Sequence, residues 1–174
     1  MRIAILSDIH GNLHALEAVL ADVDARGVER SYCLGDLVGY GAFPNEVIDL
    51  IRERRIPTVM GNYDDGVGFD KDDCGCAYKG EEMRRLGDLS LFWTREQVTP
   101  ENKAFLRSLL PNIRFEEEGK RVLLVHGSVL VAPFGAREKR FSTAPFAVGV
   151  PQPDAPPLIL DFATSRVAEG KVLN

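Results

Sequence analysis

The chain has 174 residues, a formal net charge of -5 and a sequence pI near 5.3. This length is typical of one domain with its own hydrophobic core. The net negative charge gives no positive electrostatic potential that would attract nucleic acid non-specifically. No stretch approaches the roughly 20 apolar residues of a membrane span, so we expect a cytoplasmic protein that does not associate with a membrane.

The first third of the chain alternates strand and helix patterns. Short apolar runs predict three strands, at residues 2–7, 30–34 and 57–60. Helical spacing of apolar residues predicts two helices between them, at residues 13–23 and 44–54. Asn12 is placed to cap the first helix, and Pro44 begins the second. Strands that alternate with helices over such lengths are typical of βαβ units and a mainly parallel sheet.

The chain beyond Asn62 is polar and rich in glycine, and we interpret residues 64–75 as a loop. Further along, the patterns predict helices at residues 81–98 and 100–110, and a β-hairpin with strands at residues 112–117 and 121–125. After Ser128 the patterns fade, and we predict no repeat and no second domain there.

Three cysteines, an odd number, do not make a disulfide framework, so we expect reduced thiols. Cys74 and Cys76 form a lone CxC pattern, which is a weak metal signal without a second pair. We interpret it as part of a loop beside the active cleft.

Polar side chains follow four of the predicted strands, and they are Asp8 with His10, Asp36, Asn62 and His126. Residues two apart in a strand share a face, so Asp8 and His10 can aim at one point. Ligands of open α/β sheets bind outside the carboxyl ends of the strands. Carboxylate, imidazole and amide groups together suit Mn, Fe, Zn or Mg. The pattern therefore predicts a metal site.

The same residues lie in four short blocks, in the order DIHGN at 8–12, GDLVGYG at 35–41, GNYD at 61–64 and VHGS at 125–128. These blocks resemble those of the calcineurin-like metallophosphoesterases, and more narrowly the small bacterial phosphodiesterases of that superfamily. The resemblance covers about three quarters of the chain. It implies an α/β fold, a β-sandwich flanked by helices, as a single domain over residues 1–174 in which residues 129–174 are divergent or irregular.

Carried over by position, the resemblance makes Asp8 and His10 ligands of one metal ion, Asp36 a carboxylate that bridges two ions, and Asn62 and His126 ligands of the second. It implies two divalent ions, from among Mn, Fe, Zn, Ni and Mg, that activate a bridging hydroxide for in-line attack on phosphorus. No side chain is assigned as a catalytic group beside that hydroxide.

Three residues are the expected substrate contacts, namely Asn12, Asn62 and Tyr63. Tyr63 stands where many relatives have a proton-donating histidine, and the high reference pKa of tyrosine makes it a weak replacement. His14 lies four residues after His10 on the predicted helix, and we interpret it as a surface residue.

The chain departs from the family in its last third. Relatives usually supply two more histidines in a late GHxH block, one for each metal ion, whereas this chain has three histidines in total and none after His126. Each ion would then keep three protein ligands, so we expect metal below full occupancy. A deletion or a frame error would produce such a tail, and so would real divergence.

Three functions remain open. The five aligned ligands favour a metal-dependent phosphoesterase that hydrolyses small phosphodiesters or nucleotides. The missing GHxH block favours a catalytically impaired protein of the same fold that acts as a binding scaffold. A phosphoprotein phosphatase ranks last, because GDLVGYG lacks the arginine that would grip a phosphate. The expected partner is a small phosphoester, nucleic acid is not indicated, and a homo-oligomer is compatible with the sequence.

Overall fold

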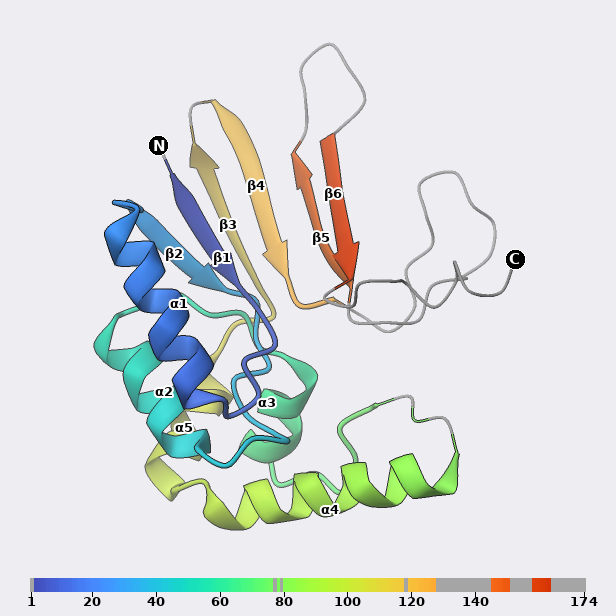
Figure 1. Cartoon of the computed structure of the whole chain (residues 1–174). Coiled ribbons are helices and arrows are strands. Elements are labelled where there is room, and N and C mark those ends of the chain that lie inside the picture. The colour runs from blue at the N-terminus through green and yellow to red at the C-terminus, as the bar shows by residue number, and fades with distance from the viewer. Residues whose placement is uncertain are drawn as a thin grey trace, which may run out of the picture. The chain divides into compact units, whose positions relative to one another are not determined.

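The computed structural model of the chain (Figure 1) describes residues 2–76, 78, 80–117, 119–127, 145–150 and 158–163. The chain divides into two compact units, Met1–Pro111 and Asn112–Asn174, called unit 1 and unit 2 below. Both helices and small sheets are present, which confirms the predicted α/β class. Within the described residues, no helix is long and apolar enough to cross a membrane.

Unit 1 contains two short strands and five helices within its described residues. In chain order these are β1 (Ile3–Leu6), α1 (Leu13–Ala25), β2 (Arg30–Cys33), α2 (Pro44–Glu53), α3 (Asn62–Gly68), α4 (Glu81–Gln97) and α5 (Pro100–Ser108). Strands β1 and β2 are parallel, as predicted. The predicted third strand is reduced to two isolated parallel bridges, from Thr58 to Cys33 and from Val59 to Leu110.

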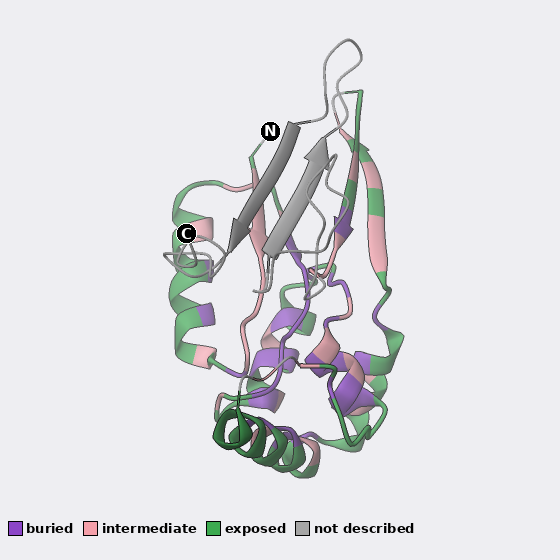
Figure 2. Cartoon of the chain, turned by 90° about the vertical axis from the view of Figure 1, so that its right-hand side faces the viewer, coloured by how far each residue is buried: buried purple, intermediate pink, exposed green. Residues whose placement is uncertain are grey.

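Local signals in the sequence account for the helix starts. The Asn12 side chain accepts a hydrogen bond from the Ala15 N–H at 3.2 Å and so caps α1. Thr99 caps α5 in the same way, through the Asn102 N–H. Apolar residues of α1 and α2 close over the strands, and α2 contributes three fully buried side chains, Val47, Ile48 and Ile51. Figure 2 shows this buried interior in purple.

Helix α3 lies where the sequence predicted a loop, so that prediction is wrong for residues 64–68. The glycines of α3 allow neighbouring side chains to pack closely against the helix. A Cβ placed on Gly68 would lie 3.1 Å from the Leu106 Cβ, and one on Gly66 would lie 3.3 Å from the Cys74 Cβ. Because glycine is common both in loops and at tight helix contacts, composition alone pointed to the wrong alternative.

The cysteines also differ from expectation. Cys74 and Cys76 form a disulfide, with their Cα atoms 5.5 Å apart, a separation that suits such a bond. The expectation of reduced thiols is therefore wrong for this pair. Cys33, on β2, is a free thiol with no exposed surface.

We expect Cys33 to resist alkylation in the folded protein. Burial raises the pKa of its thiol to about 12, so at pH 8 the thiol stays protonated and is also inaccessible to the reagent. After reduction, mass spectrometry of iodoacetamide-treated protein should show label on Cys74 and Cys76, and on Cys33 only once denaturant is added. Labelling of Cys33 at the same rate in both conditions would contradict its burial.

In unit 2 the predicted hairpin is confirmed. Strands β3 (Asn112–Glu117) and β4 (Lys120–Val125) are antiparallel, with Glu117 opposite Lys120. Two further antiparallel strands, β5 (Pro145–Val150) and β6 (Leu158–Ala163), lie in the region where the sequence predicted no element. Residues 128–144, 151–157 and 164–174 fall outside the described residues, and all of them except Ser128 belong to the predicted irregular tail.

Candidate metal centre

Two loops, one after β1 and one after β2, carry the candidate ligands. Backbone hydrogen bonds join these loops side by side. The N–H groups of Asp8 and His10 donate to the C=O groups of Gly35 and Asp36, at 3.0 and 2.9 Å, and the Gly41 N–H donates back to the His10 C=O at 2.8 Å. The path of both loops is therefore set largely by the main chain.

Glycines at two positions allow this close approach. A Cβ on Gly41 would overlap the His10 backbone, and a Cβ on Gly61 would overlap the Asp36 carboxylate. Any larger residue at Gly61 would push apart α3 and the loop that carries Asp36.

Asp8, His10 and Asp36 all have left-handed backbone conformations, with φ of 56°, 50° and 53°. Such a conformation costs a non-glycine residue roughly 1–2 kcal/mol, and strained residues of this kind cluster at functional sites. The conformation also corrects the reason given above for the convergence of Asp8 and His10. Strand β1 ends at Leu6, so the two side chains converge through loop geometry and not through strand alternation.

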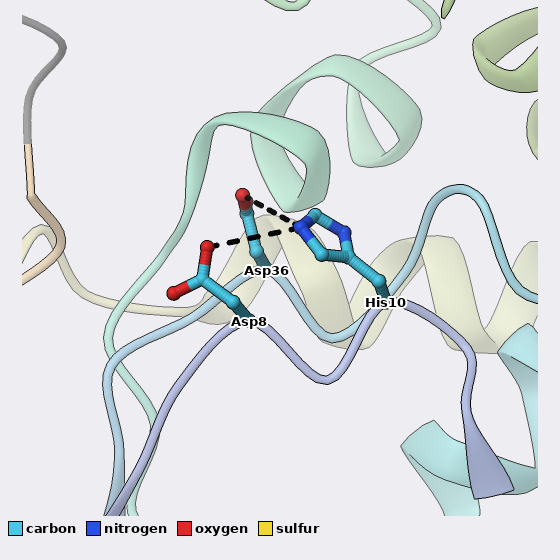
Figure 3. Close-up of side chains that lie close together, drawn as sticks. All are labelled: Asp8, His10 and Asp36. Atoms are coloured by element: carbon cyan, nitrogen blue, oxygen red, sulfur yellow. Dashed lines mark ion pairs between the residues drawn. The ribbon is translucent and has the colours of Figure 1, made fainter. Parts of the chain in front are cut away.

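The three side chains meet at one point, as Figure 3 shows. One ligand atom from each lies within 4.8 Å of the others. The His10 Nε2 is 3.7 Å from the Asp8 Oδ1 and 3.7 Å from the Asp36 Oδ2. Asp36 is buried, with 4% of its surface exposed, while Asp8 and His10 are partly exposed.

The imidazole of His10 is held in the orientation that a metal ligand needs. Its Nδ1 lies 2.9 Å from the Val38 C=O, which can only accept, so Nδ1 carries the proton and donates. The other ring nitrogen, Nε2, then faces the two carboxylates. The rings of Tyr40 and Tyr63 pack edge-on against the imidazole, with centroids at 4.8 and 5.3 Å.

Asp64 holds the main chain around Asp36 in place through hydrogen bonds. Its buried carboxylate accepts the backbone N–H groups of Asp36, Leu37 and Gly61 at 2.8–2.9 Å. Burial and the nearby Asp36 carboxylate raise the pKa of Asp64 to about 7, and the three N–H bonds oppose this rise. The Tyr63 N–H in turn donates to the Asp36 Oδ1 at 2.8 Å, so Asp36 is fixed through both its main chain and its side chain.

The other candidate ligands have different surroundings. Asn62 is the first residue of α3 and lies between Gly61 and Tyr63, which both contact Asp36. Its Nδ2 donates a hydrogen bond to the Cys76 Sγ at 3.3 Å. His126 is half-buried in unit 2, so its expected place beside the other ligands stays a prediction.

Of the expected substrate contacts, Asn12 caps α1. The His14 side chain is 75% exposed.

Three tyrosine hydroxyls meet near the site, and of these residues only Tyr63 was an expected substrate contact. The Tyr78 hydroxyl lies 2.8 Å from that of Tyr63 and 3.1 Å from that of Tyr40. Tyr63 is buried, whereas 53% of Tyr40 is exposed. Burial raises the pKa of Tyr40 to about 12 and that of Tyr63 further, so both stay protonated. No pattern in the sequence marked Tyr78, which lies in the polar segment before α4.

The donor set fits a divalent metal ion. Two ligand atoms that each lie about 2.0–2.2 Å from one ion are roughly 3–4 Å apart, and both separations from the His10 Nε2 are 3.7 Å. Two carboxylates and one imidazole suit Mn, Fe, Zn or Mg.

Comparison with known proteins finds two kinds of similarity in the chain. An uncharacterized protein of Methanocaldococcus jannaschii is 41% identical over 126 residues, which are 72% of this chain and 49% of that protein. The chain thus spans about half the length of this relative.

Residues 120–174 match the model of a family described as malate/L-lactate dehydrogenase. A Delta(1)-pyrroline-2-carboxylate/Delta(1)-piperideine-2-carboxylate reductase of Pseudomonas aeruginosa is 55% identical over 42 residues, 24% of this chain and 13% of the reductase. The part of the chain that lacks a GHxH block is therefore similar to another class of protein.

Several solved structures are also similar to the chain. A metallophosphoesterase of Sphaerobacter thermophilus is 36% identical, over 65% of this chain and 43% of that one, with a TM-score of 0.48. The hypothetical protein PH1004 of Pyrococcus horikoshii OT3 is 24% identical, over 79% and 57%, with a TM-score of 0.57. A protein provisionally described as a diadenosine tetraphosphatase is 21% identical, over 79% and 55%, with a TM-score of 0.50. The last two likenesses show the fold alone, and its mixed α/β class is the one expected from the sequence.

Proposed function

We propose that the chain carries the metal-binding part of a metal-dependent phosphoesterase that acts on small phosphodiesters or nucleotides. The observation that carries this proposal is the convergence of Asp8, His10 and Asp36, with the His10 Nε2 facing both carboxylates at 3.7 Å. The phosphoesterase-type fold supports it.

In this proposal Asp8, His10 and Asp36 hold one divalent ion, and Asp36, Asn62 and His126 hold a second. The chemistry that such ions supply is polarisation of the phosphoryl group and activation of water. Val38 and the two tyrosine rings keep the imidazole aligned, and Asp64 holds the loop that carries Asp36.

A binding scaffold of the same fold is the second candidate function. The observation that favours it is the dehydrogenase-like character of residues 120–174, which replaces the segment where further histidine ligands would be expected. Such a protein would bind a divalent ion and a phosphoester without turnover.

One experiment separates these two functions. Protein purified without chelator would be titrated with Mn²⁺, and turnover of bis(p-nitrophenyl) phosphate would be followed with and without EDTA. We expect turnover that needs Mn²⁺, stops with EDTA, and falls more than about 100-fold in His10→Ala. Metal binding without turnover would support the scaffold instead.

The matched control is His14→Ala, which removes a histidine from the exposed side of α1. It should bind metal and turn over substrate as the parent protein does. Equal behaviour of His10→Ala and His14→Ala would overturn the proposed site.

A further inference from the structure

Tyr40 is an exposed aromatic residue in the loop that also carries Asp36. Its ring packs edge-on against the His10 imidazole, with centroids 4.8 Å apart, yet 53% of the residue is exposed. Tyr63, the other tyrosine that packs against His10, is buried. Contact with the imidazole therefore leaves about half of Tyr40 open to a ligand.

The backbone of Tyr40 is left-handed, with a φ of 56°. This conformation is rare for a bulky residue, whereas glycine adopts it without strain. Its neighbours Gly39 and Gly41 are both positions where a Cβ would overlap another residue. Glycine would thus suit this turn at Tyr40 as well. A strained and half-exposed tyrosine at this position indicates a use for its ring.

The Tyr40 side chain is fixed in its exposed position by contacts with three other residues. Its N–H donates to the Ser90 Oγ of α4 at 2.9 Å, and its hydroxyl lies 3.1 Å from that of Tyr78. Its ring packs against the Tyr63 ring with centroids 4.8 Å apart. An aromatic side chain that is already ordered loses little conformational freedom when a ligand binds. The exposed part of the ring is therefore suited to contact a flat aromatic group.

The Tyr40 ring is also close enough to the candidate metal centre to contact a group attached to a bound phosphate. An ion about 2 Å from the His10 Nε2 would lie no more than about 8 Å from the centre of the Tyr40 ring. A nucleobase is joined to its phosphate through one sugar, and this link is long enough to span such a distance.

We propose that Tyr40 is a specificity-determining residue that stacks against an aromatic group of the substrate. The site then prefers phosphoesters that carry a nucleobase or an aryl group over purely aliphatic ones. This inference rests on the proposed function, because it requires a phosphoester held at the metal centre. Every nucleobase has a flat face that can stack, so the ring selects for aromatic groups in general and not for one base.

The test compares adenosine 5′-monophosphate with ribose 5-phosphate, which share the phosphate and the sugar and differ only in the base. Calorimetric titration of the full chain, saturated with Mn²⁺, would give both dissociation constants. We expect the nucleotide to bind about 10-fold more tightly or better, because stacking of a base on one aromatic side chain typically contributes a factor of roughly 5 to 150.

Variants assign this preference to the Tyr40 ring. In Tyr40→Leu the two dissociation constants should become similar, whereas Tyr40→Phe keeps the ring and should retain most of the preference. Both ligands are measured on the same metal-saturated variant, so an effect of the substitution on metal binding cancels in their ratio. The matched control is Phe69→Leu, which removes a 49% exposed ring at the end of α3 opposite Asn62. It should leave the ratio unchanged.

The parent protein alone can overturn the proposal, so the test does not depend on the folding of a variant. If it bound both ligands equally, Tyr40 would not contact the base, while the binding itself would still support the proposed function. If it bound neither ligand, the phosphate site and the proposed function would be wrong together with this inference.

The variants provide two further ways to refute the role of Tyr40. Loss of the preference in Tyr40→Phe would show that stacking on the ring is not its source. Equal ratios in Tyr40→Leu and Phe69→Leu would show that the preference arises elsewhere in the protein.

Discussion

Asp36→Asn is expected to weaken metal binding by more than about 100-fold. The change removes one negative charge from the buried group that faces His10 at 3.7 Å, yet it keeps an oxygen that can accept the Tyr63 N–H. Binding should therefore fall while the fold is retained. Calorimetric titration with Mn²⁺ would measure the affinity, and far-UV circular dichroism would check the fold.

Asp49→Asn is the matched control, because it makes the same charge change at a 61% exposed side chain on α2. Its metal affinity should equal that of the parent protein. If Asp36→Asn also bound Mn²⁺ as tightly as the parent, the assignment of Asp36 as a ligand would be wrong. If Asp36 bridges two ions as proposed, the stoichiometry of the variant should fall at both sites together.

Asp64→Asn is expected to destabilise the protein by about 2–4 kcal/mol, although Asp64 is not itself an expected ligand. Its carboxylate accepts three buried N–H groups. An asparagine offers one oxygen, so its NH₂ group must face at least one of these donors and leave it without a partner. Thermal unfolding should show a melting temperature lower by roughly 5–15 °C.

The neighbouring residue supplies the control. Asp65 is 36% exposed and pairs with Lys71 at 2.6 Å on the surface. Asp65→Asn should cost less than about 1 kcal/mol. Similar melting temperatures for the two variants would show that the three backbone bonds to Asp64 do not hold the loop of Asp36.

Much of the local structure could be predicted from the sequence because its signals are short-range. Asn12 and Thr99 cap their helices as such residues usually do, and the hairpin of unit 2 follows its alternating pattern. The third strand was harder to predict, because only Thr58 and Val59 form bridges, and each bridge joins them to a residue distant in the sequence.

The error at α3 has a different cause. Glycine in a sequence indicates either a loop or a close contact, and only the tertiary structure, in which Leu106 lies against Gly68, decides between the two. The exposure of apolar residues on α4, such as Leu89 and Trp93, was hidden for a similar reason. Helical periodicity reports that apolar residues share a face, and it does not report which face meets the core.

For the candidate site, the residue types were visible in the sequence but the geometry was not. Nothing in the letters DIHGN indicates that Asp8 and His10 adopt left-handed conformations. Likewise, Tyr78 reaches Tyr63 only because the chain folds back after α3. The backbone bonds that place these loops form between segments more than 20 residues apart, beyond the range of any local pattern.

The two loops of the candidate centre are joined by main-chain bonds, and this has a consequence for protein engineering. Because peptide groups hold the loops together, the ligand side chains can be exchanged without redirecting the chain. His10→Cys, for example, would replace an imidazole with a thiolate on the same backbone, and thiolates favour zinc over manganese. If Asp8, His10 and Asp36 bind metal as proposed, unit 1 offers a fixed backbone on which metal preference can be varied one donor at a time.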